Sequence, residues 1–131
     1  MLDAAHAAMH LWSAIGSARH IANARLLLGQ VHALLGNPRY AMPYAEAAHA
    51  YFDSNKGEPW KMAIPLAVLA NAAHCAGDRT LHESSYRAAV ALIADLPKGE
   101  DRAIIEATLN VVPKPDHRTT VHHPLSPQPP R

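Results

Sequence analysis

A spacing of 41 residues recurs along this chain and limits what it can fold into. Gly16 and Gly57 are separated by this distance, and so are Gly36 and Gly77. Further identical residues recur at the same spacing: Ala22 and Ala63, Leu28 and Leu69, Ala47 and Ala88, and Ala48 and Ala89. A fixed period of this length is typical of a repeat array, in which neighbouring units stack to bury a continuous core.

Each repeat unit is predicted to contain two helices. Apolar residues recur at helical spacing, and no strand alternation or hairpin dipeptide competes with this pattern. Ser17 and Asn37 suit helix N-caps, Gly36 suits a helix C terminus, and Thr80 with Glu83 matches a capping box. We expect about six helices, which are Leu2–Ile15, Ala18–Leu35, Pro38–Asp53, Pro59–Ala76, Leu81–Leu96 and Arg102–Asn110.

Prolines indicate two further features of the chain. Pro43 and Pro65 lie inside predicted helices, where each is expected to cause a kink, or a late helix start in the case of Pro43. Residues 111–131 hold six of the eleven prolines and show no helical period. We therefore expect one helical domain over residues 1–110, followed by a disordered Pro/His-rich tail over residues 111–131.

The composition narrows the classes of partner and compartment. A formal charge of +1 provides no strong attraction for nucleic acid or for an anionic membrane. Cys75 is the only cysteine, which excludes an intrachain disulfide and a Cys-rich zinc site. The first residues lack the pattern of a signal peptide, and the longest apolar run, Met62 to Ala73, is too short to span a bilayer. We expect a cytoplasmic protein that binds neither nucleic acid nor membrane.

Residue patterns that carry catalysis or bind metal are weak. His6 and His10 are one helical turn apart, a spacing that can bind zinc or nickel, but no cysteine or suitably placed carboxylate accompanies them. His74 and Cys75 are adjacent on a predicted helix and therefore point in different directions. No phosphate-binding loop, nucleophile elbow or paired carboxylate pattern is present in the sequence. We expect no enzymatic activity, no metal site and no cofactor.

Two segments resemble units of the tetratricopeptide repeat family. The first supplies Leu28-Gly29, His32, Gly36-Asn37, Ala41 and Ala48 at the positions that define the family. The second supplies Leu69-Ala70, Ala73, Gly77-Asp78, Tyr86 and Ala89, with His82 where alanine is usual. The resemblance implies an all-α fold in which antiparallel helix-turn-helix repeats stack as a short right-handed superhelix.

The resemblance also offers a reason for Gly29, which lies inside a predicted helix. Glycine at such a position costs about 1 kcal/mol of helix stability relative to alanine. In the family, this position lies where the two helices of a unit approach closely, so only a small residue fits. The next unit carries Ala70 at the same position.

The chain departs from the family pattern in two respects. The period is longer than usual, and the aromatic residue expected early in each first helix is replaced by Arg25 and Leu66. The longer period is similar to that of helical-repeat arrays in bacterial signal-sensing regulators.

The resemblance implies a non-catalytic module that binds a protein or peptide, as part of a regulatory or scaffold system. The expected binding surface is the concave face, which comprises Asn23, Leu26, Gln30, Ala33, Ile64, Ala67, Asn71 and His74. Some family members hold a C-terminal carboxylate on this face, but only Asn71 matches the residues that do so. Two alternatives remain open: a ligand-sensing regulatory fragment and a histidine-based metal-binding protein.

The first predicted helix suggests a site of self-association. It carries apolar residues on more than one stripe, among them Met9, Leu11 and Trp12. Nothing in it resembles the polar cap that usually closes a repeat array. We therefore expect a homodimer, or a constitutive partner contact, through these three residues.

Overall fold

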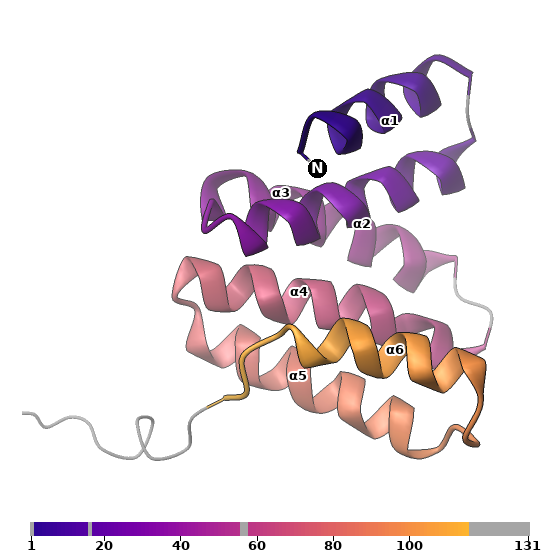
Figure 1. Ribbon diagram of the computed structural model, residues 1–131, viewed down its shortest axis with the longest axis vertical. Coiled ribbons are helices and arrows are strands. Elements are labelled where there is room, and N and C mark those ends of the chain that lie inside the picture. The colour runs from indigo at the N-terminus through magenta and orange to yellow at the C-terminus, as the bar shows by residue number, and fades with distance from the viewer. Residues whose placement is uncertain (1, 16, 56–57, 116–131) are drawn as a thin grey trace, which may run out of the picture.

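The computed structural model describes residues 2–15, 17–55 and 58–115, and all regular structure in these ranges is helical (Figure 1). The six α-helices are α1 (Leu2–Ile15), α2 (Ala18–Leu34), α3 (Pro38–Ser54), α4 (Ala63–Ala76), α5 (Arg79–Ala94) and α6 (Glu100–Asn110). A short 3-10 helix, η1 (Pro59–Met62), precedes α4. The predicted all-α class and the predicted number of helices are therefore confirmed.

Local chemistry sets several of the helix ends. The Ser17 hydroxyl accepts a hydrogen bond from the backbone N–H of His20 at 3.3 Å, which makes Ser17 the N-cap of α2. Gly36 and Gly77 adopt left-handed φ angles of 73° and 78°, so glycine is favoured where α2 and α4 end. Gly16 and Gly57, the other glycine pair at the 41-residue spacing, lie outside the described residues.

Three predicted helix starts are wrong by a few residues, and the simplest case is α6, which begins at Glu100 rather than at Arg102. The N-cap of α5 is Asp78, whose carboxylate accepts from the Leu81 N–H at 3.1 Å, so the predicted cap Thr80 lies in the first turn. The α-helical part of the fourth predicted helix begins at Ala63 rather than at Pro59. Pro65 consequently occupies the first turn of α4, where a missing backbone N–H leaves no helix bond unmade. Pro43 neither delays nor interrupts α3.

The helix contacts repeat with the 41-residue period. The helix α2 packs against α3 and α4, and α4 packs in the same order against α5 and α6. The contact of α3 with α4 is repeated by that of α5 with α6, and α1 packs against α2 (Figure 1). Each helix therefore buries a face against its sequence neighbours, which is the packing expected of a helical repeat.

Small residues dominate the core between these helices. One cluster joins α4, α5 and α6 and contains Ala63, Ala67, Ala70, Ala89, Ile93, Ile105, Leu109 and Val112. A second joins α2, α3 and α4, and a third joins α1 to α2. In the third cluster Leu2, Ala5 and Met9 of α1 pack with Leu28 and Val31 of α2.

Gly29 lies at the closest approach of α2 and α3. A Cβ atom at this position would be 3.1 Å from the backbone nitrogen of Ala45 and 3.3 Å from its Cα. Backbone atoms cannot move aside as the end of a side chain can. The predicted reason for this glycine, close packing of two helices, is therefore confirmed.

The packed domain extends beyond its predicted end at Asn110. Val112 is 3% exposed and belongs to the core cluster of α4, α5 and α6. The carbonyl oxygen of Pro113 accepts a hydrogen bond at 2.6 Å from Nε2 of His82, which is buried on α5. His82, a departure from the family pattern, thus holds the segment that leaves α6. Residues 116–131 lie outside the described residues, and their predicted disorder stays a prediction.

Candidate functional site

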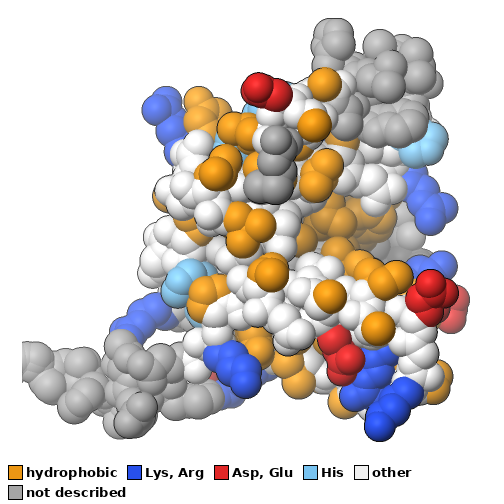
Figure 2. Space-filling view, in the orientation of Figure 1, with side chains coloured by type: hydrophobic (Ala, Val, Ile, Leu, Met, Phe, Trp, Pro, Cys, Tyr) orange, Lys and Arg blue, Asp and Glu red, His pale blue; other side chains and the backbone are white. Residues whose placement is uncertain are grey.

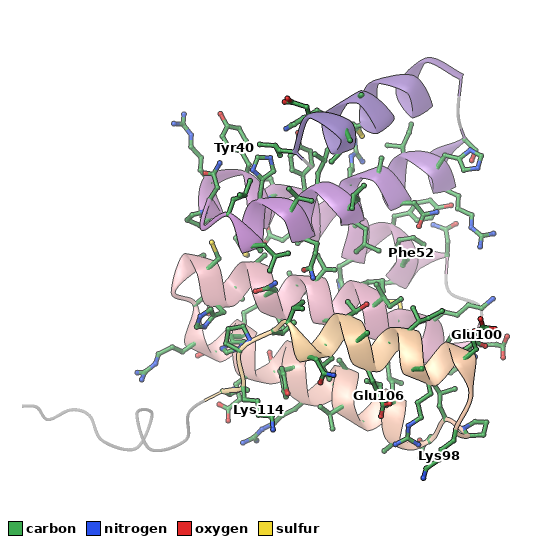
Figure 3. All side chains as sticks on the ribbon, viewed as in Figure 1. Tyr40, Phe52, Lys98, Glu100, Glu106 and Lys114 are labelled. Atoms are coloured by element: carbon green, nitrogen blue, oxygen red, sulfur yellow. The ribbon has the colours of Figure 1, made fainter. Side chains whose placement is uncertain are left out.

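An open groove lies where α2 crosses the end of α3 and the start of α4. Its volume is about 410 Å³, and residues of α2, α3, η1, α4 and the adjoining loop line it. We call it the α2–α4 groove. Phe52 marks its position in Figure 3, between the ribbons of α2 and α4.

The floor of the α2–α4 groove is apolar. Leu26 from α2 and Ile64 from α4 are half-buried, and each also packs against the core that the two helices share. The last turns of α3 contribute Tyr51 and Phe52, whose rings meet edge to face with centroids 5.2 Å apart. Figure 2 shows hydrophobic atoms set back between α2 and α4, with Lys or Arg side chains at the same edge. Such a surface favours an apolar side chain of a ligand.

The rim of the groove is polar and partly fixed by internal bonds. Glu58 accepts a hydrogen bond from Trp60 Nε1 at 3.0 Å and pairs with Lys61 across 3.9 Å. Asn55 donates to the carbonyl oxygen of Tyr51 at 2.9 Å. Arg19 and Asn23, in contrast, are exposed on α2. The rim therefore offers free hydrogen-bond donors beside an apolar floor.

The structure places the residues of the predicted concave face in different surroundings. Asn23, Leu26 and Ile64 line the α2–α4 groove. The prediction is wrong for three residues that are buried and unavailable to a partner, namely Ala33, Ala67 and Asn71. The physical reason is that α2 and α4 pack directly against each other, so positions between them belong to the core.

Asn71 illustrates the correction. Its Nδ2 donates to Oε1 of Gln30 at 3.2 Å, so these predicted ligand-binding side chains bind each other between α4 and α2. The bond joins residues one repeat period apart. His74 is exposed, but its ring lies 4.9 Å from that of His82 and outside the groove. The buried amide of Asn71 thus has its hydrogen-bond partner in Gln30 and is not presented to a ligand.

The predicted association patch on α1 is tested only at Met9. Met9 is half-buried and packs in the core of α1 and α2, whereas the side chains of Leu11 and Trp12 lie outside the described residues. The homodimer through this helix stays a prediction.

A pair of histidines connects α1 to α2. The Nε2 atoms of His6 and His32 are 3.3 Å apart. Asn37 donates through Nδ2 to Nδ1 of His32, also at 3.3 Å, so the proton of neutral His32 resides on Nε2 and is donated to His6. The ring of Tyr44 stacks on that of His32 with centroids 5.9 Å apart. The sequence suggested His6 with His10, because helical spacing carries no sign of a contact between different helices.

Burial keeps His32 neutral and thereby couples stability to pH. Burial, and secondarily the neighbouring His6, lowers the pKa of His32 from its ordinary value of about 6.5. Around and below that pH, His32 binds a proton more readily in the unfolded chain than in the folded chain. The free energy of unfolding therefore falls as the pH falls.

We therefore expect the urea midpoint of the wild type to drop between about pH 7.5 and about pH 5.5. His32→Gln is expected to show a smaller drop over the same interval, since the remaining histidines are common to both proteins. Equal drops in the two proteins would show that His32 does not carry the effect.

The described residues also bear on two other features, a metal site and a membrane-spanning helix. Among them, no group of three or more His, Cys, Asp or Glu side chains is arranged to hold a metal ion. Within the same ranges, no helix has both the length and the apolar character needed to cross a membrane. Cys75 is half-buried, and burial raises the pKa of its thiol, which disfavours the reactive thiolate.

The chain matches no protein-family model, no curated protein and no solved structure. Its geometry is therefore the basis on which a function can be inferred. Within the described residues, the α2–α4 groove combines an open apolar floor with exposed polar groups on its rim.

Proposed function

We propose that this chain is a non-catalytic module of the tetratricopeptide type, which binds a segment of another protein in the α2–α4 groove. The observation that supports this most is the open apolar floor formed by Leu26, Phe52 and Ile64 between successive repeat helices. Helical repeats bind partners through surfaces of this kind because stacked units form an extended face.

The size and chemistry of the groove favour a peptide segment over a reacting substrate. A volume of about 410 Å³ falls within the usual range of ligand pockets and accommodates a few side chains. The described residues that line it include no histidine and no cysteine, and Glu58 is already bonded to Trp60 and Lys61. The lining thus offers binding surface without a base and a nucleophile in contact.

Selection from a peptide library tests this proposal. A random dodecapeptide library displayed on phage is selected on the immobilised wild type, and each selected peptide is measured against two variants. Asn23→Trp places a large ring at an exposed position on the groove, whereas Ala50→Trp places it at an exposed position of α3 that does not line the groove.

We expect peptides that bind the wild type and Ala50→Trp equally, and Asn23→Trp about tenfold more weakly or worse. Circular dichroism checks that both variants melt as the wild type does. Phe52→Ala, which removes part of the floor, is expected to weaken the same peptides. A library that yields only peptides insensitive to Asn23→Trp and Phe52→Ala would contradict the proposal.

A further inference from the structure

The α2–α4 groove differs in charge from a second groove, which lies between α5 and α6. Among the described residues that line it, Arg19 and Lys61 are cationic and Glu58 is anionic, so the lining carries one net positive charge. The groove between α5 and α6, of about 450 Å³, contains Arg102 and Glu106 and is neutral. Arg102 is bonded to Glu106 at 3.1 Å and to the carbonyl oxygen of Leu96 at 2.8 Å.

The cations of the α2–α4 groove are available to a ligand. Arg19 makes no ion pair or hydrogen bond with another side chain within the described part of the protein. The Lys61 side chain is 53% exposed, so its ammonium can reach a ligand, although its Nζ already lies 3.9 Å from Glu58 and 5.8 Å from the centroid of the Trp60 ring. The guanidinium of Arg19 can bind a carboxylate through two parallel hydrogen bonds.

We propose that the segment bound in the α2–α4 groove is acidic: an aromatic or large aliphatic side chain lies on the floor, and a neighbouring Asp or Glu pairs with Arg19 and Lys61. This inference rests on the proposed function and adds the chemistry of the partner. The inference that the segment is acidic rests on charge complementarity, because the net charge beside the apolar floor is positive.

The chain's own C-terminal residues do not suit this role. The side chains of residues 116–131 include two arginines, Arg118 and Arg131, but one carboxylate, Asp116, so these side chains carry a net positive charge, as the groove does. A basic segment would place like charges together at the rim. The occupant is therefore a partner protein rather than this tail.

A second round of peptide selection tests the proposed chemistry. The double variant Arg19→Glu/Lys61→Glu reverses both rim charges, and Arg39→Glu/Lys98→Glu makes the same change in net charge at exposed positions outside the groove. The full chain is used, and the charge of the peptides that are sensitive to Asn23→Trp is compared among wild type and variants.

Wild type and Arg39→Glu/Lys98→Glu are expected to select acidic peptides, and Arg19→Glu/Lys61→Glu to select basic ones. An acidic peptide selected on the wild type should lose at least about tenfold in affinity for Arg19→Glu/Lys61→Glu and should bind more weakly at high salt. Two results would overturn this inference and leave the proposed function standing. In the first, the peptides that are sensitive to Asn23→Trp lack acidic residues. In the second, wild type and Arg19→Glu/Lys61→Glu select peptides of the same charge. Selection that yields no peptide sensitive to Asn23→Trp would overturn both this inference and the proposed function.

Discussion

Gly29→Leu is expected to lower the free energy of unfolding by about 1–3 kcal/mol or more, because the added side chain has no space between α2 and α3. The first added atom alone would lie 3.1 Å from the backbone nitrogen of Ala45. Leucine is a better helix former than glycine by somewhat less than about 1 kcal/mol, so the steric cost outweighs the propensity gain. Urea denaturation of the two proteins measures the difference.

Ala50→Leu is the matched control for this substitution. Ala50 is exposed on α3, so the same final side chain should change stability by no more than about 0.5 kcal/mol. A Gly29→Leu protein that melts higher than the wild type would refute the close contact at this position.

Val112→Asp should destabilise the protein by at least about 2 kcal/mol, although the residue lies beyond the last helix. Val112 is 3% exposed in a cluster with Ile105 and Leu109, so the substitution buries a carboxylate among apolar side chains. It also disturbs the segment whose next residue, Pro113, accepts the hydrogen bond of His82. Thermal and urea unfolding report the loss.

Val111→Asp separates this effect from a general consequence of added charge. Val111 is 48% exposed, so the same change one residue earlier should alter stability by about 0.5 kcal/mol or less. Similar losses for the two variants would indicate that the chain after α6 is not anchored through Val112.

The sequence was sufficient to predict the features that depend on local periodicity. The six helices follow from apolar spacing and from caps such as Ser17, and Gly29 was understood from its place in a repeat unit. Errors at helix ends arose where two caps competed. Asp78 rather than Thr80 accepts the hydrogen bond that caps α5, from the Leu81 N–H. At the fourth predicted helix, Pro59 begins a 3-10 helix rather than an α-helix.

The groove was harder to predict from the sequence, because it depends on how the helices are placed in space. The family pattern assigns contact positions along α2 and α4, but direct packing of these helices buries Asn71 against Gln30. The opening lies instead at the helix ends, where Arg19, Phe52 and Lys61 come from separate elements. No spacing in the sequence relates these three residues.

The exposed apolar side chains of α6 provide one competing surface for a partner. Ile104 is 53% exposed, and Figure 2 shows hydrophobic side chains at the surface over α6. Its residues lie apart from the α2–α4 groove and carry none of the rim cations. A partner that used this face would therefore be distinguished by position as well as by charge.

Mapping the bound surface tests the central claim most directly. A peptide selected on the wild type is titrated into protein labelled with nitrogen-15, and the amide shifts are followed by NMR. We predict that saturable shifts cluster at Arg19, Asn23, Phe52 and Lys61. Shifts confined to α1, or to α6 around Ile104, would contradict the assignment of the α2–α4 groove as the binding site.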